Sequence, residues 1–269
     1  MATNDRQFTG SIPEVYDRLL VPLIFEPYAC EMAERIAGLA PRDVLEVAAG
    51  TGVVTRALAA RLPRTARILA TDLNQPMLDH ARARSAADTQ ITWMQADALA
   101  LPFEDGRFDA VACQFGAMFF PDKVKAYGEA CRVLRRGGRF LFNVWDEIGR
   151  NAFADIVTHA LAELFPDDPP RFLARTPHGY NDAETIRAEL GAAGFGAITI
   201  EAVEAIAHAP SPEQPAAAFC QGTPLRGEIE ARGGSLDAAT RHAAAALAAR
   251  FGTGPIDGPI RALVVTAAR

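Results

Sequence analysis

Cysteine is scarce in this sequence. Its four cysteines form no C-x-x-C pair and lie at no metal-ligand spacing with a histidine; they are Cys30, Cys113, Cys131 and Cys220. A disulfide scaffold is excluded, and we expect four reduced core thiols and no bound metal. Long apolar runs are also missing, because no stretch approaches the roughly 18 residues that a membrane helix needs. The first ten residues are polar and unlike a secretory signal, so we expect a cytoplasmic protein without a membrane partner.

A surplus of positive charge is missing too. Lysine and arginine number 27 against 33 aspartates and glutamates, which gives a net charge of −6. An acidic chain without a basic stripe is a poor partner for a phosphate polymer, so we expect no nucleic-acid partner. Repeats of about 20–50 residues are absent, which excludes a solenoid.

What is present is 269 residues of ordinary globular composition, 49% of them hydrophobic. Short apolar runs alternate with amphipathic stretches in the middle of the chain, which is the pattern of βαβ units. The expected strands are 43–47, 67–71, 91–95, 110–114 and 139–144, and the expected helices are 53–62, 77–85 and 122–133. Asn74 is expected to cap the second helix, and Gly137-Gly138 to form a turn before the fifth strand. The pattern predicts an α/β fold with a parallel sheet covered on both faces.

The flanking segments are predicted to be mostly helical. We expect a helical stretch at 12–39, a helix at 152–165, a proline-rich loop at 166–178 and a helix at 237–250. Asn181 and Ser211 have the spacing of capping boxes and predict two further helix starts. Strands are expected at 197–203 and 260–268.

The segment Val44–Thr55 (VLEVAAGTGVVT) runs from a buried strand through small residues into a helix. Such a turn lies at the carboxyl edge of a parallel sheet, where ligands bind. A Walker A loop is excluded because Gly-Lys-Ser/Thr is absent, and Thr55 departs from the dinucleotide fingerprint G-x-G-x-x-G/A. The acid Glu46, four residues before Gly50, favours a ligand with a cationic amino acid end over a pyrophosphate. The alternative is a tight structural turn.

Two further acids follow the next two strands. Asp72 lies 20 residues beyond Gly52, where nucleotide-binding α/β folds hold ribose hydroxyls. Asp97 is placed to accept from an adenine amino group, and the N–H of Ala98 to donate to the ring. Each acid alone is explained as a loop or capping residue, but three at the ends of successive strands predict one adenosyl-binding edge.

These motifs resemble the class I S-adenosylmethionine-dependent methyltransferases of the small-molecule kind that includes quinone-biosynthesis enzymes. The matching segments are VLEVAAGTGVVT (44–55), ATDLNQPMLDHA (70–81), QADALALPFEDGRFDAVACQF (95–115) and RVLRRGGRFLFNVW (132–145). One departure is Ala48, which replaces the first glycine of the E-x-G-x-G-x-G pattern and adds only a methyl group. The resemblance implies a Rossmann-like doubly wound seven-stranded sheet, mostly parallel with an antiparallel last strand, and added helices between the last two strands.

The resemblance also implies which residues bind S-adenosyl-L-methionine and its product S-adenosyl-L-homocysteine. Glu46, Ala48, Gly50 and Gly52 would line the methionine part. The remaining contacts would be Asp72, Leu73 and Met77 at the ribose, Asp97 and Ala98 at the adenine, and Gln114 and Phe115 near the sulfonium. Tyr16 and Phe25 would cover the site; the alternative is that they are ordinary core aromatics.

On this basis we expect a single methyltransferase domain over residues 1–269. Its parts would be an N-terminal helical cover (1–40), a cofactor-binding core (41–147), a substrate-side helix and loop (148–180) and C-terminal strands (181–269). A helical insertion at 205–258 would serve either as a cover over the active site or as an oligomer surface.

The expected reaction is transfer of a methyl group to a small-molecule acceptor by in-line displacement, driven mainly by proximity and orientation. The sequence identifies no general base. Asp146, Glu147, His159 and His178 are candidates, and each is better explained as a solvated loop residue or a satisfied histidine. Arg135-Arg136 is expected to be a solvated turn. The rival functions are an NAD(P)-dependent oxidoreductase and a cofactor-binding module without turnover.

Overall fold

A computed structural model describes residues 12–85 and 88–269, so the expectation about the first ten residues lies outside it. The chain divides into two compact units, each built from three segments of the sequence. Unit 1 takes residues 1–25, 145–180 and 203–262, of which 12–25 are the described part of the first segment. Unit 2 takes residues 26–144, 181–202 and 263–269.

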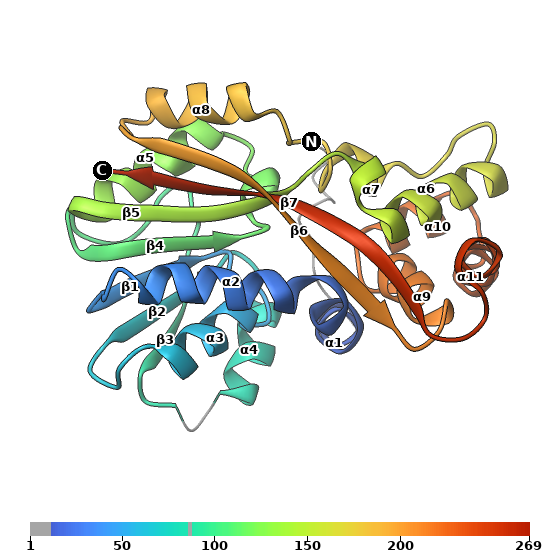
Figure 1. Ribbon diagram of the computed structural model, residues 1–269, viewed down its shortest axis with the longest axis horizontal. Coiled ribbons are helices and arrows are strands. Elements are labelled where there is room, and N and C mark those ends of the chain that lie inside the picture. The colour runs from blue at the N-terminus through green and yellow to red at the C-terminus, as the bar shows by residue number, and fades with distance from the viewer. Residues whose placement is uncertain (1–11, 86–87) are drawn as a thin grey trace. The chain divides into compact units, whose positions relative to one another are not determined.

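The described strands form a seven-stranded sheet in the order β3-β2-β1-β4-β5-β7-β6 (Figure 1). They are β1 Asp43–Val47, β2 Arg67–Asp72, β3 Ile91–Gln95, β4 Phe108–Gln114, β5 Leu134–Trp145, β6 Ile198–Ala209 and β7 Ile256–Ala268. The first five strands pair in parallel. β7 runs antiparallel: beside the start of β5, Arg269 at the chain end exchanges backbone hydrogen bonds with Gly137 and Gly138. The expected Rossmann-like α/β sheet with an antiparallel last strand is confirmed.

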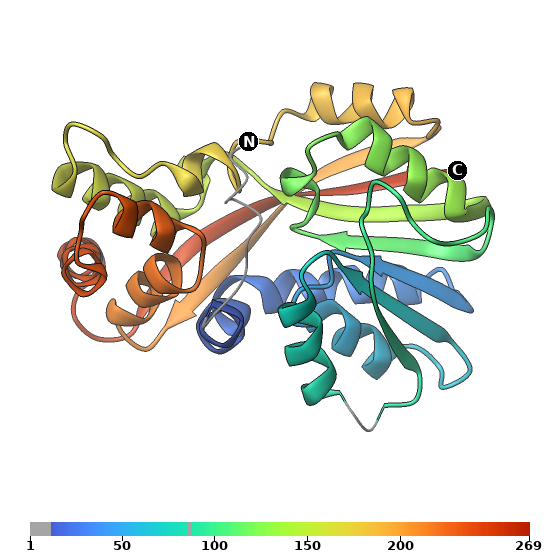
Figure 2. The same ribbon diagram turned by 180° about the vertical axis from the view of Figure 1, so that it is seen from behind.

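Helices cover both faces of the sheet in unit 2. On one face α2 (Glu26–Ala37) packs with α3 (Val53–Arg61), and α4 (Gln75–Arg84) follows β2. On the other face α5 (Lys123–Val133) packs beside α8 (Ala183–Ala192), as Figure 2 shows. Alternation along β5 separates the faces: Leu141 joins the core under α2 and α3, whereas Phe140 and Phe142 contact the ring of Tyr127 on α5.

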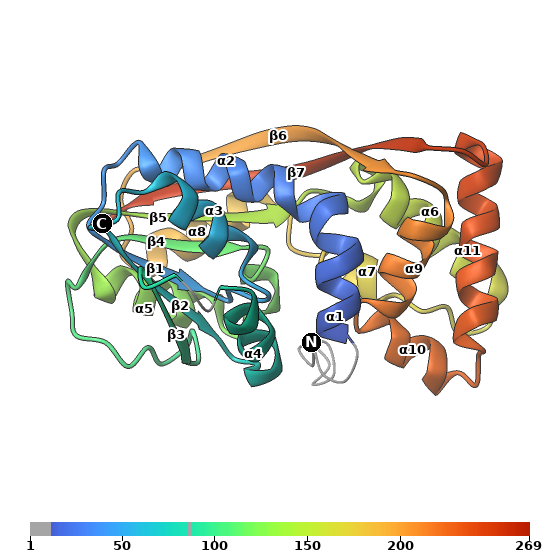
Figure 3. The same cartoon turned by 90° about the horizontal axis from the view of Figure 1, so that it is seen from below.

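Unit 1 is mainly helical. It contains α1 (Ile12–Val15), the π-helix η2 (Tyr16–Phe25), the short η4 (Ile148–Arg150), α6 (Ala152–Leu164), α7 (Phe172–Arg175), α9 (Glu213–Gln221), α10 (Leu225–Ala231) and α11 (Leu236–Phe251). α11 packs against α6 and α9, and α9 packs against η2 (Figure 3). The fully buried side chains of Ala239, Ala243 and Leu247 form the inner face of α11. The helices between the last two strands therefore share a core with the N-terminal segment.

Several predicted strand boundaries are wrong. β6 continues to Ala209 and β7 begins at Ile256, so the helical part of the insertion runs only from 213 to 251. Gly137-Gly138 form no separate turn. Phe108 pairs with Leu134 and Ala110 with Arg139, so the intervening residues of β5 bulge outward. Arg136 in this bulge is exposed, as expected, whereas the half-buried Arg135 pairs its guanidinium with the carboxylates of Asp109 and Asp43.

Some predicted helix starts are wrong as well. Asp182, not Asn181, caps α8 by accepting from the backbone N–H of Thr185 at 2.7 Å. Pro212, not Ser211, occupies the N-cap position of α9, and no side chain caps the start of this helix. Asn74 stands at the N-cap of α4 but caps nothing with its side chain. The loop at 166–178 contains α7, and α10 was not predicted.

The cysteines follow the expectation only in part. All four are free thiols; Cys113 and Cys220 are buried and Cys131 is half-buried. Cys30 is exposed on α2, which contradicts its placement in the core. Within residues 12–85 and 88–269, helices long and apolar enough to cross a membrane were looked for, and none was found.

Candidate functional site

The small-residue loop lies over the carboxyl edge of the sheet in unit 2. Glu46 near the end of β1 is in register with Ala70 of β2 and Ala112 of β4. From there the chain turns through residues 48–52 into α3, and Ala49 N–H donates to the Thr71 carbonyl at 2.9 Å. The turn requires left-handed backbone at Ala48, Gly50 and Gly52, with φ of 56°, 56° and 81°. Glycine adopts that conformation without strain, whereas Ala48 does not.

Glu46 is a buried acid, 1% exposed. Its carboxylate accepts from the hydroxyl of Thr55, the residue that breaks the dinucleotide fingerprint. Burial raises the pKa of Glu46 to about 8; the charge of Asp72 adds to this shift, and the Thr55 bond and Arg56 oppose it. When burial has raised the pKa of a carboxyl group, a neighbouring cationic group stabilises its ionised form. The position therefore fits the amino group of an amino acid moiety.

Asp72 ties the loop to the end of β2. One carboxylate oxygen accepts from Gly50 N–H at 2.8 Å, and the other accepts from the backbone and side-chain amides of Asn74 at 2.8 and 3.3 Å. Burial raises the pKa of Asp72, while these hydrogen bonds act against the rise. Since each carboxylate oxygen has two lone pairs, Asp72 keeps capacity to accept from ribose hydroxyls.

Asp97 follows β3, and hydrogen bonds join the end of β3 to the end of β2. The Asp72 carbonyl accepts from Ala96 N–H at 3.1 Å, and the Gln95 side chain donates to the Leu73 carbonyl at 2.9 Å. Asp97 itself is exposed and accepts from Leu99 N–H at 2.9 Å. The structure thus places Glu46, Asp72 and Asp97 at the carboxyl edge of three adjacent parallel strands.

Three apolar residues predicted at the same edge differ in exposure. Leu73 is 44% exposed, whereas Met77 and Ala98 are buried. The Met77 Cε atom lies 3.9 Å from where a Cβ on Gly50 would be, which is ordinary contact distance. The backbone at Gly50 is therefore open to close approach by a ligand.

The end of β4 completes this edge. Gln114 is 9% exposed, and Phe115 adopts left-handed backbone with φ of 49°. Phe115 N–H donates to both the carbonyl and the side-chain oxygen of Asn143, at 3.1 and 3.0 Å, and its ring meets Tyr28 edge-on at 5.5 Å. A Cβ on Gly116 would lie 2.5 Å from the Ala48 methyl, so the loops after β1 and β4 touch.

Sequence reasoning missed Asn143 and Tyr28. Asn143 is fully buried in the apolar strand segment FLFNVW, and this isolated polar residue was a usable signal. Tyr28 is a fully buried aromatic on an amphipathic helix, so nothing local distinguished it from other core rings.

The predicted aromatic cover belongs to unit 1. The rings of Tyr16 and Phe25 stack at 4.9 Å, and Phe25 lies 5.9 Å from Trp145. Their action as a cover over the cofactor stays a prediction.

The base candidates also belong to unit 1. His178 is buried, with Nδ1 2.9 Å from the Asp146 carbonyl, and burial lowers its pKa to about 4, so the imidazole is neutral at pH 7. The Asp146 carboxylate is bound by Arg261 Nε at 2.5 Å. Glu147 and His159 are paired on the surface with Arg150 and Asp155. Asp146 is thus a structural ion-pair partner, and His178 is the buried neutral member of the set.

Comparison with known proteins extends these observations. A family profile described as a methyltransferase domain matches residues 44–138. The demethylmenaquinone methyltransferase of Thermus thermophilus is 34% identical over 166 residues, covering 58% of this chain and 75% of that protein. The ubiquinone/menaquinone biosynthesis C-methyltransferase UbiE of Ectopseudomonas mendocina is 31% identical over 177 residues, covering 61% and 69%.

A solved structure gives a likeness of fold. The phosphoethanolamine N-methyltransferase 2 of Haemonchus contortus, in complex with S-adenosyl-L-methionine, superposes with a TM-score of 0.62 at 17% identity. The match covers 100% of this chain and 60% of that one.

Proposed function

This chain belongs to the class I S-adenosylmethionine-dependent methyltransferases of the quinone-biosynthesis type, and from that membership we propose that its small-molecule acceptor is a hydroquinone, methylated on a ring carbon. The support is the names of relatives that match over most of their own length, a demethylmenaquinone methyltransferase and a C-methyltransferase of ubiquinone and menaquinone biosynthesis.

We further propose that the acidic edge of unit 2 holds the cofactor. Buried Glu46, whose pKa is raised to about 8, would bind the amino group, and Asp72 the ribose hydroxyls. Asp97 and Ala98 would bind the adenine, and the open backbone at Gly50 would admit the methionine part. The single observation that best supports this assignment is the buried carboxyl of Glu46 beside Asp72, because a cationic group of the ligand would stabilise its ionised form.

The cofactor supplies a methyl group already activated by a positively charged sulfur. The protein then has to orient the acceptor in line with it and exclude water. Well-oriented binding can contribute about 7–11 kcal/mol to lowering the barrier. Asn143 serves this purpose by fixing the backbone of Phe115 through two hydrogen bonds, so the end of β4 is held in one geometry.

Calorimetric titration with S-adenosyl-L-homocysteine, NAD and NADP tests the cofactor assignment. We expect saturable binding of S-adenosyl-L-homocysteine and no binding of either nicotinamide cofactor. The reverse result would replace the proposal with an oxidoreductase.

An assay with a labelled methyl donor tests the acceptor. Hydroquinone, phenol, amine, thiol, fatty-acid and nucleic-acid acceptors are compared, and we expect label only in the hydroquinone. Label in another class would refute the hydroquinone. Absence of label in every acceptor class, with the cofactor still bound, would favour a binding module without turnover.

A further inference from the structure

Ala48 and Gly116 are the reverse of what their backbone conformations favour. Ala48 has left-handed backbone with φ of 56°, a conformation that strains a residue with a methyl group and does not strain glycine. Gly116 has right-handed backbone, with φ of −102° and ψ of −35°, which residues of every type adopt. The methyl group therefore lies on the residue whose backbone favours glycine, and glycine lies where the backbone does not require it.

The space between the two residues explains this arrangement. A Cβ on Gly116 would lie 2.5 Å from the Ala48 methyl and 2.8 Å from Cys113 Sγ, and both distances are too short for real atoms. Residue 116 can only be glycine because the Ala48 methyl and the Cys113 thiol already fill that space. Within unit 2 this contact joins the loop after β1 to the loop after β4.

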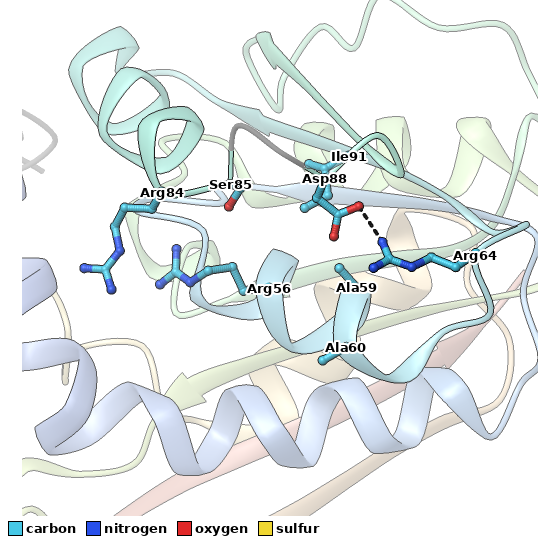
Figure 4. A pocket seen from close by; sticks show the side chains of 8 residues that line it. All are labelled: Arg56, Ala59, Ala60, Arg64, Arg84, Ser85, Asp88 and Ile91. Atoms are coloured by element: carbon cyan, nitrogen blue, oxygen red, sulfur yellow. Dashed lines mark hydrogen bonds and ion pairs between the residues drawn. The ribbon is translucent and has the colours of Figure 1, made fainter.

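Hydrogen bonds hold the loop after β1 at other points, and they lead to other elements. Ala49 N–H donates to the Thr71 carbonyl on β2 at 2.9 Å. Arg56 of α3, which lines the pocket drawn in Figure 4, donates to the Thr51 carbonyl at 2.6 Å. These bonds fix the loop to β2 and α3, whereas the Ala48 methyl makes the contact with the loop after β4.

The loop after β4 is strained at the same place. Phe115, which precedes Gly116, has left-handed backbone with φ of 49°, and its N–H donates to two oxygens of Asn143. Among the described residues, one further non-glycine residue has a positive φ, and that is Ala40. Backbone strain persists where the surrounding structure enforces it, and it concentrates at functional sites. Two of these three strained residues lie beside one contact, at the edge that we assign to the cofactor.

We propose that Ala48 is a positioning residue for the cofactor, an inference that rests on the function proposed above. Its methyl group sets the separation of the two loops before a ligand binds, so the methionine part of the cofactor enters a site that is already formed. A preformed site binds more tightly because less conformational freedom is lost on binding. Glycine at this position would relieve the backbone and leave the two loops free to move apart. Ala48 therefore lowers the stability of the protein and raises its affinity for the cofactor.

Ala48→Gly tests the proposal, with calorimetric titration of S-adenosyl-L-homocysteine and thermal unfolding as the two readouts. We expect the affinity to fall about three- to tenfold, because binding must then order the freed loop. The melting temperature should stay unchanged or rise, because the strain is relieved. A residue that only supported the fold would lower the melting temperature and the affinity together.

Ala40→Gly is the matched control. Ala40 is exposed and has the same left-handed backbone, with φ of 48°, but it precedes β1, whereas Ala48 follows it. Glycine relieves the same strain there, so we expect no fall in melting temperature and the affinity of the wild type.

Equal affinities in Ala40→Gly and Ala48→Gly would overturn the proposal, and so would a lower melting temperature in Ala48→Gly. If the wild type and both variants all fail to bind S-adenosyl-L-homocysteine, the proposed function is refuted and this inference with it.

Gly116→Ala tests the contact itself without a ligand. In the wild type the added methyl group meets both Ala48 and Cys113, whereas in Ala48→Gly only the contact with Cys113 remains. We expect Gly116→Ala to lower the melting temperature in both backgrounds, and less in Ala48→Gly than in the wild type. Equal losses would mean that the Ala48 methyl does not fill this space, and the proposal would be overturned.

Discussion

At the scale of single residues, the raised pKa of Glu46 makes the free energy of unfolding depend on pH. Its pKa is about 8 in the folded protein and 4.5 in the unfolded chain, so the folded state binds more protons between these values. Stability should therefore fall as pH rises from about 4.5 to 8, by at most about 1.4 kcal/mol per pH unit, and level off above 8. Urea unfolding of the ligand-free protein across this range should show a slope that Glu46→Gln removes.

Glu34→Gln is the control for this measurement. Glu34 is an exposed acid of α2, and its loss should leave the pH slope as in the wild type. If Glu46→Gln and Glu34→Gln give the same slope, the buried acid is not the source of the effect.

Asp72 makes a second prediction at this scale. Asp72→Asn keeps one side-chain oxygen for the loop but removes the charge, and we expect the affinity for S-adenosyl-L-homocysteine to fall by about 1.5–3 kcal/mol. Calorimetry measures the change. Asp79→Asn, at an exposed acid of α4 that accepts from Gln75, should have no effect. An unchanged dissociation constant in Asp72→Asn would refute its ribose role.

At the scale of elements, the sequence predicts those strands and helices that a local pattern of residues encodes. The strands at 43–47 and 91–95 were located to the residue, because apolar runs bounded by turns define them. β6 was predicted too short: its burial alternates weakly along most of its length, so no sharp pattern marks its end. The bond between Asn143 and Phe115 joins residues 28 positions apart, and nothing local to either one encodes it.

The junction between the loop and α3 gives a prediction for an element. A Cβ on Gly52 would lie 2.6 Å from the Trp93 ring, and the φ of 81° strains any other residue. Gly52→Ala should destabilise the protein by about 1–3 kcal/mol. Gly128→Ala, inside α5 with nothing within 4 Å, should stabilise it by about 0.5–1 kcal/mol. Thermal unfolding compares the two, and shifts of the same sign would contradict this reasoning.

At the scale of the whole molecule, unit 1 has one core built from distant segments. Leu247 on α11 is fully buried, whereas Leu164 at the end of α6 is 39% exposed. Leu247→Ala should cost about 2–5 kcal/mol of unfolding free energy, and Leu164→Ala less than about 1 kcal/mol. Denaturant unfolding measures both. Comparable losses would mean that the inserted helices do not share the core described above.

The position of β7 has a consequence for how the protein is made. β7 is synthesised after the other strands of the sheet, yet it lies between β5 and β6. Until residues 256–268 emerge, the backbone edges of β5 and β6 have no neighbour to close them, and an open strand edge invites pairing with another nascent chain. The sheet can therefore be completed only after residues 256–268 have been synthesised, and a pause before that point would leave the nascent chain prone to aggregation.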